Sequence, residues 1–155
     1  MTNKDRNNIK GSKKAIVDTG KKTLRILLAE DDDEMRNLLA ESLHGEGYDI
    51  VECPNGLGLL MSLRDYIVPP SGSPKKEFDL VISDIRMPGV TGLEILEGLH
   101  HVGDCPPIIL ITAFGDSATH QRAEQCGVAA MFDKPFDMNE LLGKVQDIAL
   151  AGNSM

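Results

Sequence analysis

The 155-residue chain contains no tryptophan, and aromatic residues make up only 4% of its composition. An aliphatic interior is more typical of α/β domains than of aromatic-rich β-sandwiches. The sequence also has no apolar run of bilayer length and does not open with a signal peptide. We therefore expect a cytoplasmic protein with no membrane partner. The length suits one compact domain and is too short for two ordinary ones.

Cysteines are few and scattered. Cys53, Cys105 and Cys126 are widely spaced and form no CxxC pair. An odd number without metal-ligand spacing argues against a disulfide framework or a zinc site, so we expect free thiols. The chain has no Walker motif, and the glycines at 56–60 lack the third glycine of a dinucleotide-binding fingerprint.

Basic residues are scarce outside the first 22 positions. Residues 1–22 contain seven Lys or Arg and two Asp or Glu, whereas residues 23–155 contain nine basic and twenty-two acidic residues. The first segment also lacks apolar periodicity, so we expect a disordered basic tail ahead of a domain at 23–151. A nucleic-acid arm is the less favoured interpretation, because no aromatic residue is interleaved. We expect no direct DNA binding by this chain.

Beyond the tail, short apolar strands alternate with helix-length amphipathic segments. This alternation is typical of βαβ units, which build a parallel sheet with helices on both faces. The predicted fold class is therefore α/β, and Pro, Ser and Gly residues predict a loop at 69–77. Strands are expected at 24–29, 48–53, 78–84, 106–112 and 129–132, and helices at 35–43, 54–66, 93–101, 116–125 and 137–150.

Five polar residues close the apolar runs. Glu30 and Asp31 follow the first run, and Asp84 ends the third. Thr112 ends the fourth run, and Lys134 closes the fifth. Because parallel strands point the same way, their carboxyl ends meet at one edge, where the ligand crevice of an open α/β sheet lies. We expect these side chains to form one site.

The residue types in this group suit a metal ion and a phosphoryl group. Carboxylates are the hard oxygen ligands that Mg²⁺ prefers, and a lysine and a hydroxyl beside the metal can bind phosphoryl oxygens. The acidic run 30–34 also has a simpler interpretation, a solvated helix start with Asp32 or Asp33 as N-cap. That interpretation does not account for Asp84 or Lys134 at the ends of other strands.

The chain resembles the receiver domains of two-component response regulators. The resemblance rests on the acidic pair after the first strand and on the segments VISDIRMPGVTGLEIL, ITAFGD and DKPF. It runs from Leu24 to about Leu150. It implies a flavodoxin-like receiver fold, in which a five-stranded parallel sheet is doubly wound with strand order 2-1-3-4-5.

The resemblance also implies a role for each residue of the predicted site. Asp84 would accept a phosphoryl group, Thr112 would hydrogen-bond that group, and Lys134 would pair with one of its oxygens. The cofactor would be Mg²⁺, and the lysine would precede a cis-proline. The implied metal ligands are the side chains of Asp31 and Asp84, the side chain of Glu30 either directly or through water, and the main-chain carbonyl of Arg86.

The function implied by the resemblance is a phosphorylation switch. The donor would be a sensor histidine kinase or a phosphotransfer protein, and the face formed by the fourth helix, fifth strand and fifth helix would then bind a downstream partner. The chain would catalyse its own phosphorylation and dephosphorylation without being a conventional enzyme, and a homodimer is compatible with this function. Two alternatives stay open: a receiver fragment of a longer transcription activator, and a binding module that acts without phosphorylation.

Two features depart from the family pattern. Met131 stands three residues before the lysine, where the family often has a Tyr or Phe that swings inward on activation. A flexible methionine can fill the same gap. The loop at 67–77 is longer than usual, and we interpret it as a tolerated insertion at the end of the sheet opposite the site.

Overall fold

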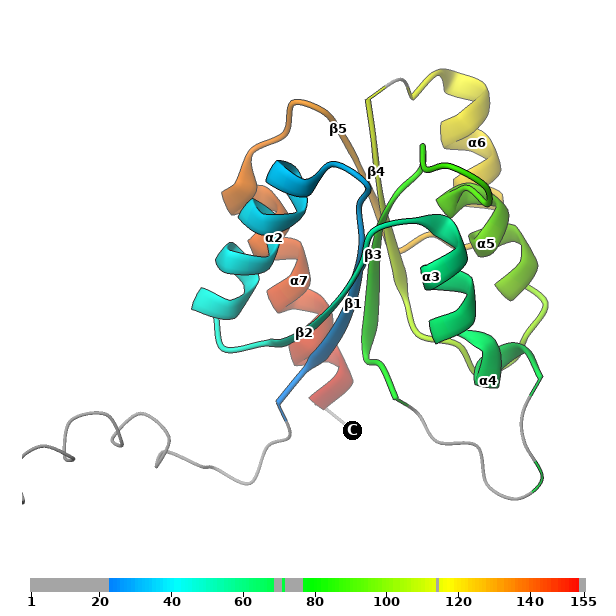
Figure 1. Ribbon diagram of the computed structural model, residues 1–155, viewed down its shortest axis with the longest axis horizontal. Coiled ribbons are helices and arrows are strands. Elements are labelled where there is room, and N and C mark those ends of the chain that lie inside the picture. The colour runs from blue at the N-terminus through cyan, green and yellow to red at the C-terminus, as the bar shows by residue number, and fades with distance from the viewer. Residues whose placement is uncertain (1–22, 69–70, 72–76, 114, 154–155) are drawn as a thin grey trace, which may run out of the picture.

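In the part of the chain that the structure describes, one parallel sheet of five strands has helices on both faces (Figure 1). A computed structural model describes residues 23–68, 71, 77–113 and 115–153. The strand order is β2-β1-β3-β4-β5, which confirms the predicted topology. The elements are β1 (Arg25–Ala29), α2 (Asp33–Gly45), β2 (Asp49–Cys53), α3 (Gly56–Ser62), α4 (Arg64–Ile67), β3 (Leu80–Asp84), α5 (Gly92–Leu99), β4 (Ile108–Thr112), α6 (Ser117–Gln125), β5 (Ala130–Asp133) and α7 (Met138–Asn153).

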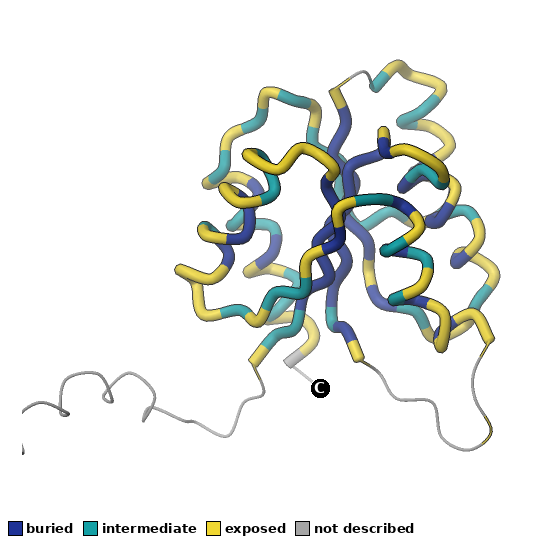
Figure 2. The backbone as a smooth tube through the Cα atoms, viewed as in Figure 1, coloured by how far each residue is buried: buried dark blue, intermediate teal, exposed yellow. Residues whose placement is uncertain are grey.

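Side-chain alternation along the strands divides the interior into two cores. Ile26 and Leu28 of β1 pack on one face with residues of α2 and α7, whereas Leu27 and Ala29 pack on the other face with residues of α3, α5 and α6. Figure 2 shows the buried strands between helices whose outer sides are exposed. Burial of aliphatic side chains on both faces explains why the strands are nearly continuous apolar runs.

Short polar side chains cap several of the helices. Asp32 is the N-cap of α2, and its carboxylate accepts hydrogen bonds from the backbone N–H groups of Glu34 and Met35. This cap satisfies donors that the first turn leaves unpaired, and it confirms one of the two predicted caps. The Asp137 carboxylate likewise accepts from the backbone N–H of Asn139, as predicted for the last helix.

The prediction of one continuous helix at 54–66 is wrong. The structure has two short helices, α3 and α4, which are separated at Leu63. Gly56 is the first residue of α3, and a side chain there would collide with the carbonyl of Val90, so this position requires glycine. Other boundaries move slightly; for example, α5 begins at Gly92 and ends at Leu99, and α7 continues to Asn153.

Two sequence predictions concern residues outside the described part of the chain. The basic tail at 1–22 and most of the loop at 67–77 belong to this group. None of the helices in the described ranges combines the length and the apolar character needed to span a bilayer.

Candidate functional site

The strand ends bring the predicted site residues together. Ala29 of β1 pairs with Ser83 of β3, so Glu30 and Asp84 follow at the same level of the sheet. Thr112 of β4 pairs with Asp133 of β5, and the backbone N–H of Lys134 donates to the Thr112 carbonyl at 2.8 Å. The sheet register therefore places an acid, a hydroxyl and a lysine at one edge.

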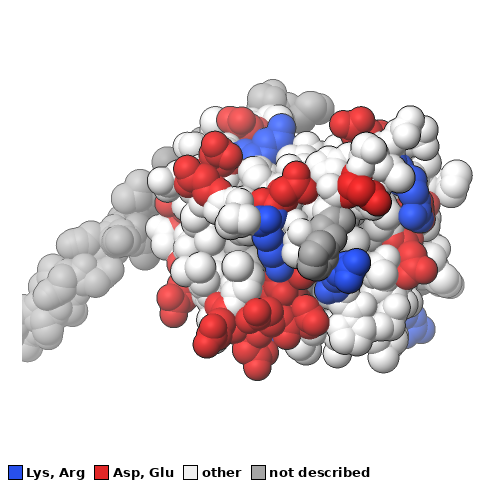
Figure 3. All heavy atoms as spheres, turned by 90° about the horizontal axis from the view of Figure 1, so that it is seen from above, with Lys and Arg blue, Asp and Glu red and all other residues white. Residues whose placement is uncertain are grey.

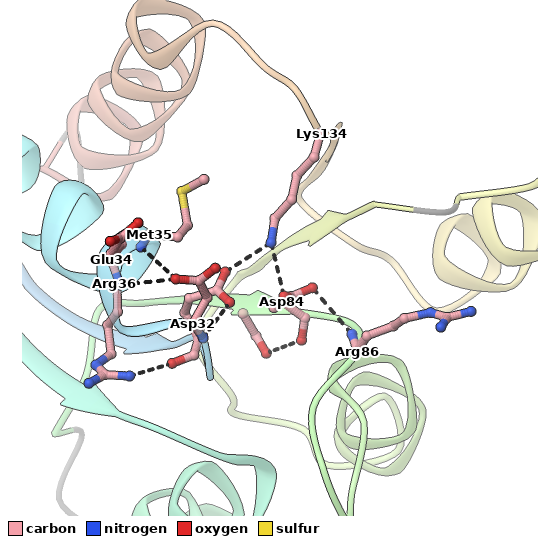
Figure 4. Close-up of polar contacts among 9 residues, drawn as sticks. Asp32, Glu34, Met35, Arg36, Asp84, Arg86 and Lys134 are labelled. Carbon is pink, nitrogen blue, oxygen red and sulfur yellow. Dashed lines mark hydrogen bonds and ion pairs between the residues drawn. The ribbon is translucent and has the colours of Figure 1, made fainter.

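Lys134 links two buried carboxylates. Its Nζ donates to Asp84 Oδ2 and to Glu30 Oε1, each at 3.1 Å (Figure 4). Glu30 is 1% exposed and Asp84 is 5% exposed, whereas the lysine side chain is 21% exposed. Buried charges need such partners, because an unpaired carboxylate in the interior is costly.

Three carboxylates lie close enough to share a cation. Glu30, Asp31 and Asp84 each offer an oxygen, and these atoms lie within 4.8 Å of one another. Asp31 is exposed and the other two are buried, so the cluster opens to solvent on one side. A set of carboxylate oxygens with an open side fits Mg²⁺, which prefers hard oxygen ligands and keeps several waters.

Burial and charge shift the ionisation of this cluster. Burial raises the pKa of Glu30 from 4.5 to about 7, and the neighbouring Asp84 charge adds to the increase, although hydrogen bonds from the Asp32 N–H and Lys134 oppose it. Burial alone would lower the pKa of Lys134, but its hydrogen bonds and charge contacts with Asp84 and Glu30 leave that pKa raised. The lysine therefore stays charged beside the acids.

The backbone after β3 also takes part in the site. The N–H of Arg86 donates to Asp84 Oδ1 at 3.2 Å, while the Arg86 side chain is exposed and points away from the carboxylate (Figure 4). One oxygen of Asp84 thus faces a backbone donor and the other faces Lys134. The role of the Arg86 carbonyl as a metal ligand stays a prediction.

Space for a ligand lies on both sides of Arg86. One open hollow of about 450 Å³ reaches Asp31, and another of about 500 Å³ reaches Asp133. Figure 3 looks onto this edge of the sheet and shows acidic side chains gathered over part of it, with basic side chains beside them. The hollows are lined by Asp31, Arg86, Met87, Pro88 and Thr91, and by Arg86, Ala113, Gly115, Asp116 and Asp133.

Sequence reasoning missed two polar contacts beside the site. Arg36 donates to the main-chain carbonyl of Glu30, and His120 Nε2 lies 3.1 Å from Asp133 Oδ1. The position of Arg36 three residues after Asp33 predicts an ion pair between these two side chains on the helix, but it does not indicate the bond to the Glu30 carbonyl. The pair of His120 and Asp133 joins α6 to the end of β5, and no spacing in the sequence indicates it.

Met131 and Phe132 of β5 lie on opposite faces of the sheet. Met131 is half-buried and packs with the core that contains Leu110, its partner in β4. Phe132 packs with the opposite core, in contact with the ring of Phe136. Strand alternation therefore directs Phe132 away from the face where Met131 lies. The peptide bond between Lys134 and Pro135 is cis, as the resemblance implied.

Comparison with known proteins agrees with this geometry. The sequence model of the response regulator receiver domain matches residues 26–146. Sporulation initiation phosphotransferase F of Bacillus subtilis (strain 168) is 32% identical over 122 residues, which cover 79% of this chain and 90% of that protein. Probable transcriptional regulatory protein SilR of Salmonella typhimurium is 31% identical over 133 residues, which cover 85% of this chain and 54% of SilR. The chain thus spans about half the length of that regulator.

Solved structures show the same fold. The receiver domain of Francisella response regulator 1452 matches with a TM-score of 0.71 and 19% sequence identity, covering 84% of this chain and 100% of that one. At this identity the likeness concerns the fold alone. The family match over most of the chain, together with the sheet order, shows that this protein belongs to the response regulator receiver domain family.

Proposed function

We propose that the chain accepts a phosphoryl group on Asp84 from a phosphohistidine of a sensor histidine kinase or phosphotransfer protein, with Mg²⁺ as cofactor. The observation that carries the proposal is the bridge from Lys134 Nζ to Asp84 and Glu30, at 3.1 Å each, within a cluster of three carboxylates. A lysine held against an acid in a cation-binding cluster suits the transfer of a phosphoryl group to that acid.

The chemistry uses few groups of the chain. A carboxylate oxygen of Asp84 attacks phosphorus, and the bond from phosphorus to the donor nitrogen breaks. Held by Glu30, Asp31, Asp84 and the main-chain carbonyl of Arg86, Mg²⁺ would supply positive charge to the phosphoryl oxygens. The ammonium of Lys134 pairs with another of these oxygens, because it already lies beside Asp84.

Thr112 connects phosphorylation to the partner-binding face. Its side chain is buried at the end of β4, next to the strand that carries Asp84. A hydrogen bond from its hydroxyl to the phosphoryl group draws the following loop inward, and this shifts the equilibrium between inactive and active forms. The face formed by α6, β5 and α7 then binds a downstream partner in the cytoplasm or a second copy of the chain.

A second candidate is a receiver that forms part of a longer transcription activator. The match to SilR, which covers 54% of that probable transcriptional regulatory protein, favours this possibility. The match to sporulation initiation phosphotransferase F, over 90% of its length, favours a receiver without an attached output domain. Both candidates use the same phosphorylation of Asp84.

Intact mass spectrometry tests the phosphorylation. We expect the wild-type chain, incubated with Mg²⁺ and acetyl phosphate, to gain one phosphoryl group. The gain should be absent in Asp84→Asn, which lacks the nucleophilic carboxylate, and when EDTA removes the metal, whose positive charge offsets that of the phosphoryl oxygens. Asp147→Asn, an exposed change on α7, is the matched control and should keep the gain.

The outcome decides between the phosphorylation switch and its alternative. A gain that persists in Asp84→Asn would assign the acceptor elsewhere. A folded wild-type chain that gains nothing from acetyl phosphate or phosphoramidate would contradict the proposal, and it would favour a binding module that acts without phosphorylation.

A further inference from the structure

We propose that Arg36 is a positioning residue that orients the peptide between Glu30 and Asp31 for binding of Mg²⁺. This inference rests on the proposed function, because it concerns the metal site of that reaction. Arg36 lies in the first turns of α2 and does not belong to the carboxylate cluster itself. It acts through the backbone that carries two of the three acids.

The guanidinium of Arg36 joins three elements. Its Nη1 donates to the Glu30 carbonyl at 2.8 Å, its Nη2 donates to Asp33 Oδ1 at 2.7 Å, and its Nε lies 3.3 Å from Glu52 Oε1. The Arg36 side chain is 15% exposed, and Figure 4 shows it beside the acidic loop. The planar fork of an arginine can satisfy several such partners at once, which a lysine cannot do.

The contact with the Glu30 carbonyl fixes the peptide plane that leads to Asp31. The N–H of Glu30 donates to the Cys53 carbonyl at 3.1 Å, so the other side of Glu30 is tied to β2. The N–H of Asp32 donates to Glu30 Oε2, also at 3.1 Å. Asp31 therefore lies between two anchored neighbours. Without Arg36, the Glu30 carbonyl would lose this donor, and the peptide between Glu30 and Asp31 could rotate. The direction of the exposed Asp31 carboxylate would then change as well.

Positioning and charge predict opposite effects of Arg36 on metal affinity. A positive guanidinium near three carboxylates repels any further cation that approaches them. The charge of Arg36 alone therefore weakens Mg²⁺ binding. A residue that orients a ligand strengthens binding, and loss of such a neighbour typically costs tenfold or more in metal affinity. The sign of the change therefore separates the two roles.

Calorimetric titration with Mg²⁺ tests the assignment in the full chain. We expect the Kd to rise about tenfold in Arg36→Lys, which keeps the charge but loses the fork, and to rise in Arg36→Ala as well. Arg122→Lys is the matched control, because the guanidinium of Arg122 also makes more than one hydrogen bond, in this case two to Glu97, which joins α6 to α5. Its Kd should equal that of the wild type. Far-UV circular dichroism checks that each variant is folded.

Each other result overturns the inference. An unchanged Kd in Arg36→Lys, together with a lower Kd in Arg36→Ala, would assign Arg36 a purely electrostatic effect. If Arg36→Ala does not fold, Arg36→Lys alone decides, and a Kd equal to that of the wild type contradicts positioning. A wild-type chain without saturable Mg²⁺ binding would refute the metal site of the proposed function itself, which distinguishes that failure from failure of the role of Arg36.

Discussion

Glu30 is the residue of the site whose ionisation opposes folding. Its pKa is about 7 in the folded chain and 4.5 ordinarily, so between these values the folded state retains a proton that the unfolded state has released. In the metal-free protein, the contribution of Glu30 to stability should therefore be greatest below about pH 4.5. The free energy of unfolding should then fall by about 1 kcal/mol per pH unit as the pH rises toward 7. Urea unfolding at about pH 5 and pH 7 measures the difference.

The variant Glu30→Gln should flatten this pH dependence, because the side-chain amide of glutamine does not titrate in this pH range. Glu41→Gln is the control, since Glu41 is exposed on α2, and it should leave the dependence unchanged. If stability depended on pH equally in the wild type and in Glu30→Gln, Lys134 would fully compensate the buried carboxylate, and the pKa of Glu30 would not be raised.

The residues of the site could be predicted to different degrees. Glu30 and Asp84 were accessible because each interrupts an apolar run, and parallel strands bring such positions together. The bond from Arg36 to the Glu30 carbonyl was not accessible, because a main-chain acceptor leaves no mark in the sequence. The pair of His120 and Asp133 depends on how α6 packs against β5, which spacing alone does not determine.

At the scale of elements, α5 offers a direct test of why a glycine begins a helix. A Cβ at Gly92 would meet the Asp84 carbonyl at 2.7 Å and Ser83 Oγ at 2.8 Å, whereas a Cβ at Gly98 would have nothing within 4 Å. We expect Gly92→Ala to lower the free energy of unfolding by about 1–3 kcal/mol through overpacking. Gly98→Ala should raise it by about 0.5–1 kcal/mol, because alanine favours the helix. Urea unfolding of both variants checks the opposite signs.

The comparison is sharp because both glycines belong to one short helix. If both variants gained stability, the backbone of Asp84 would have to yield easily, and the close approach of α5 to β3 would not be a constraint. If both lost stability, helix propensity would not govern the exposed position of Gly98.

Element boundaries were the part of the fold least accessible from sequence. The strands were placed well, because buried parallel strands are continuous apolar runs with polar residues after them. The break between α3 and α4 was missed, since the pattern at 54–66 is compatible with one helix. The first turn of α3 depends on contact between Gly56 and the Val90 carbonyl, which lies far away in sequence.

For the molecule as a whole, the strand order needed more than periodicity. Alternating strands and helices indicate a doubly wound parallel sheet, but many orders satisfy that pattern. The order 2-1-3-4-5 came from the resemblance of the strand-end residues to receiver domains, and the sheet confirms it. This order places β1 beside β3, and so Glu30 beside Asp84.

The acidic character of residues 23–155 makes the effect of Mg²⁺ on overall stability informative. Binding to the folded state alone at about 100 times the Kd stabilises by about 2.7 kcal/mol, which raises the Tm by several degrees in a domain of this size. Any divalent cation also screens an excess of thirteen negative charges. We therefore expect Mg²⁺ to raise the Tm above that in NaCl of equal ionic strength, as measured by thermal unfolding with circular dichroism.

Asp31→Asn should remove this extra rise, because it takes away the exposed ligand of the cluster while leaving Glu30 and Asp84 in the core. Asp65→Asn, an exposed change on α4, should retain it. An equal rise in Asp31→Asn and the wild type would attribute the effect of Mg²⁺ to screening of the whole acidic surface. Loss of the rise in Asp31→Asn alone would place the bound cation at the carboxyl edge of the sheet, where the proposed function needs positive charge to offset that of Asp84 as a phosphoryl group approaches.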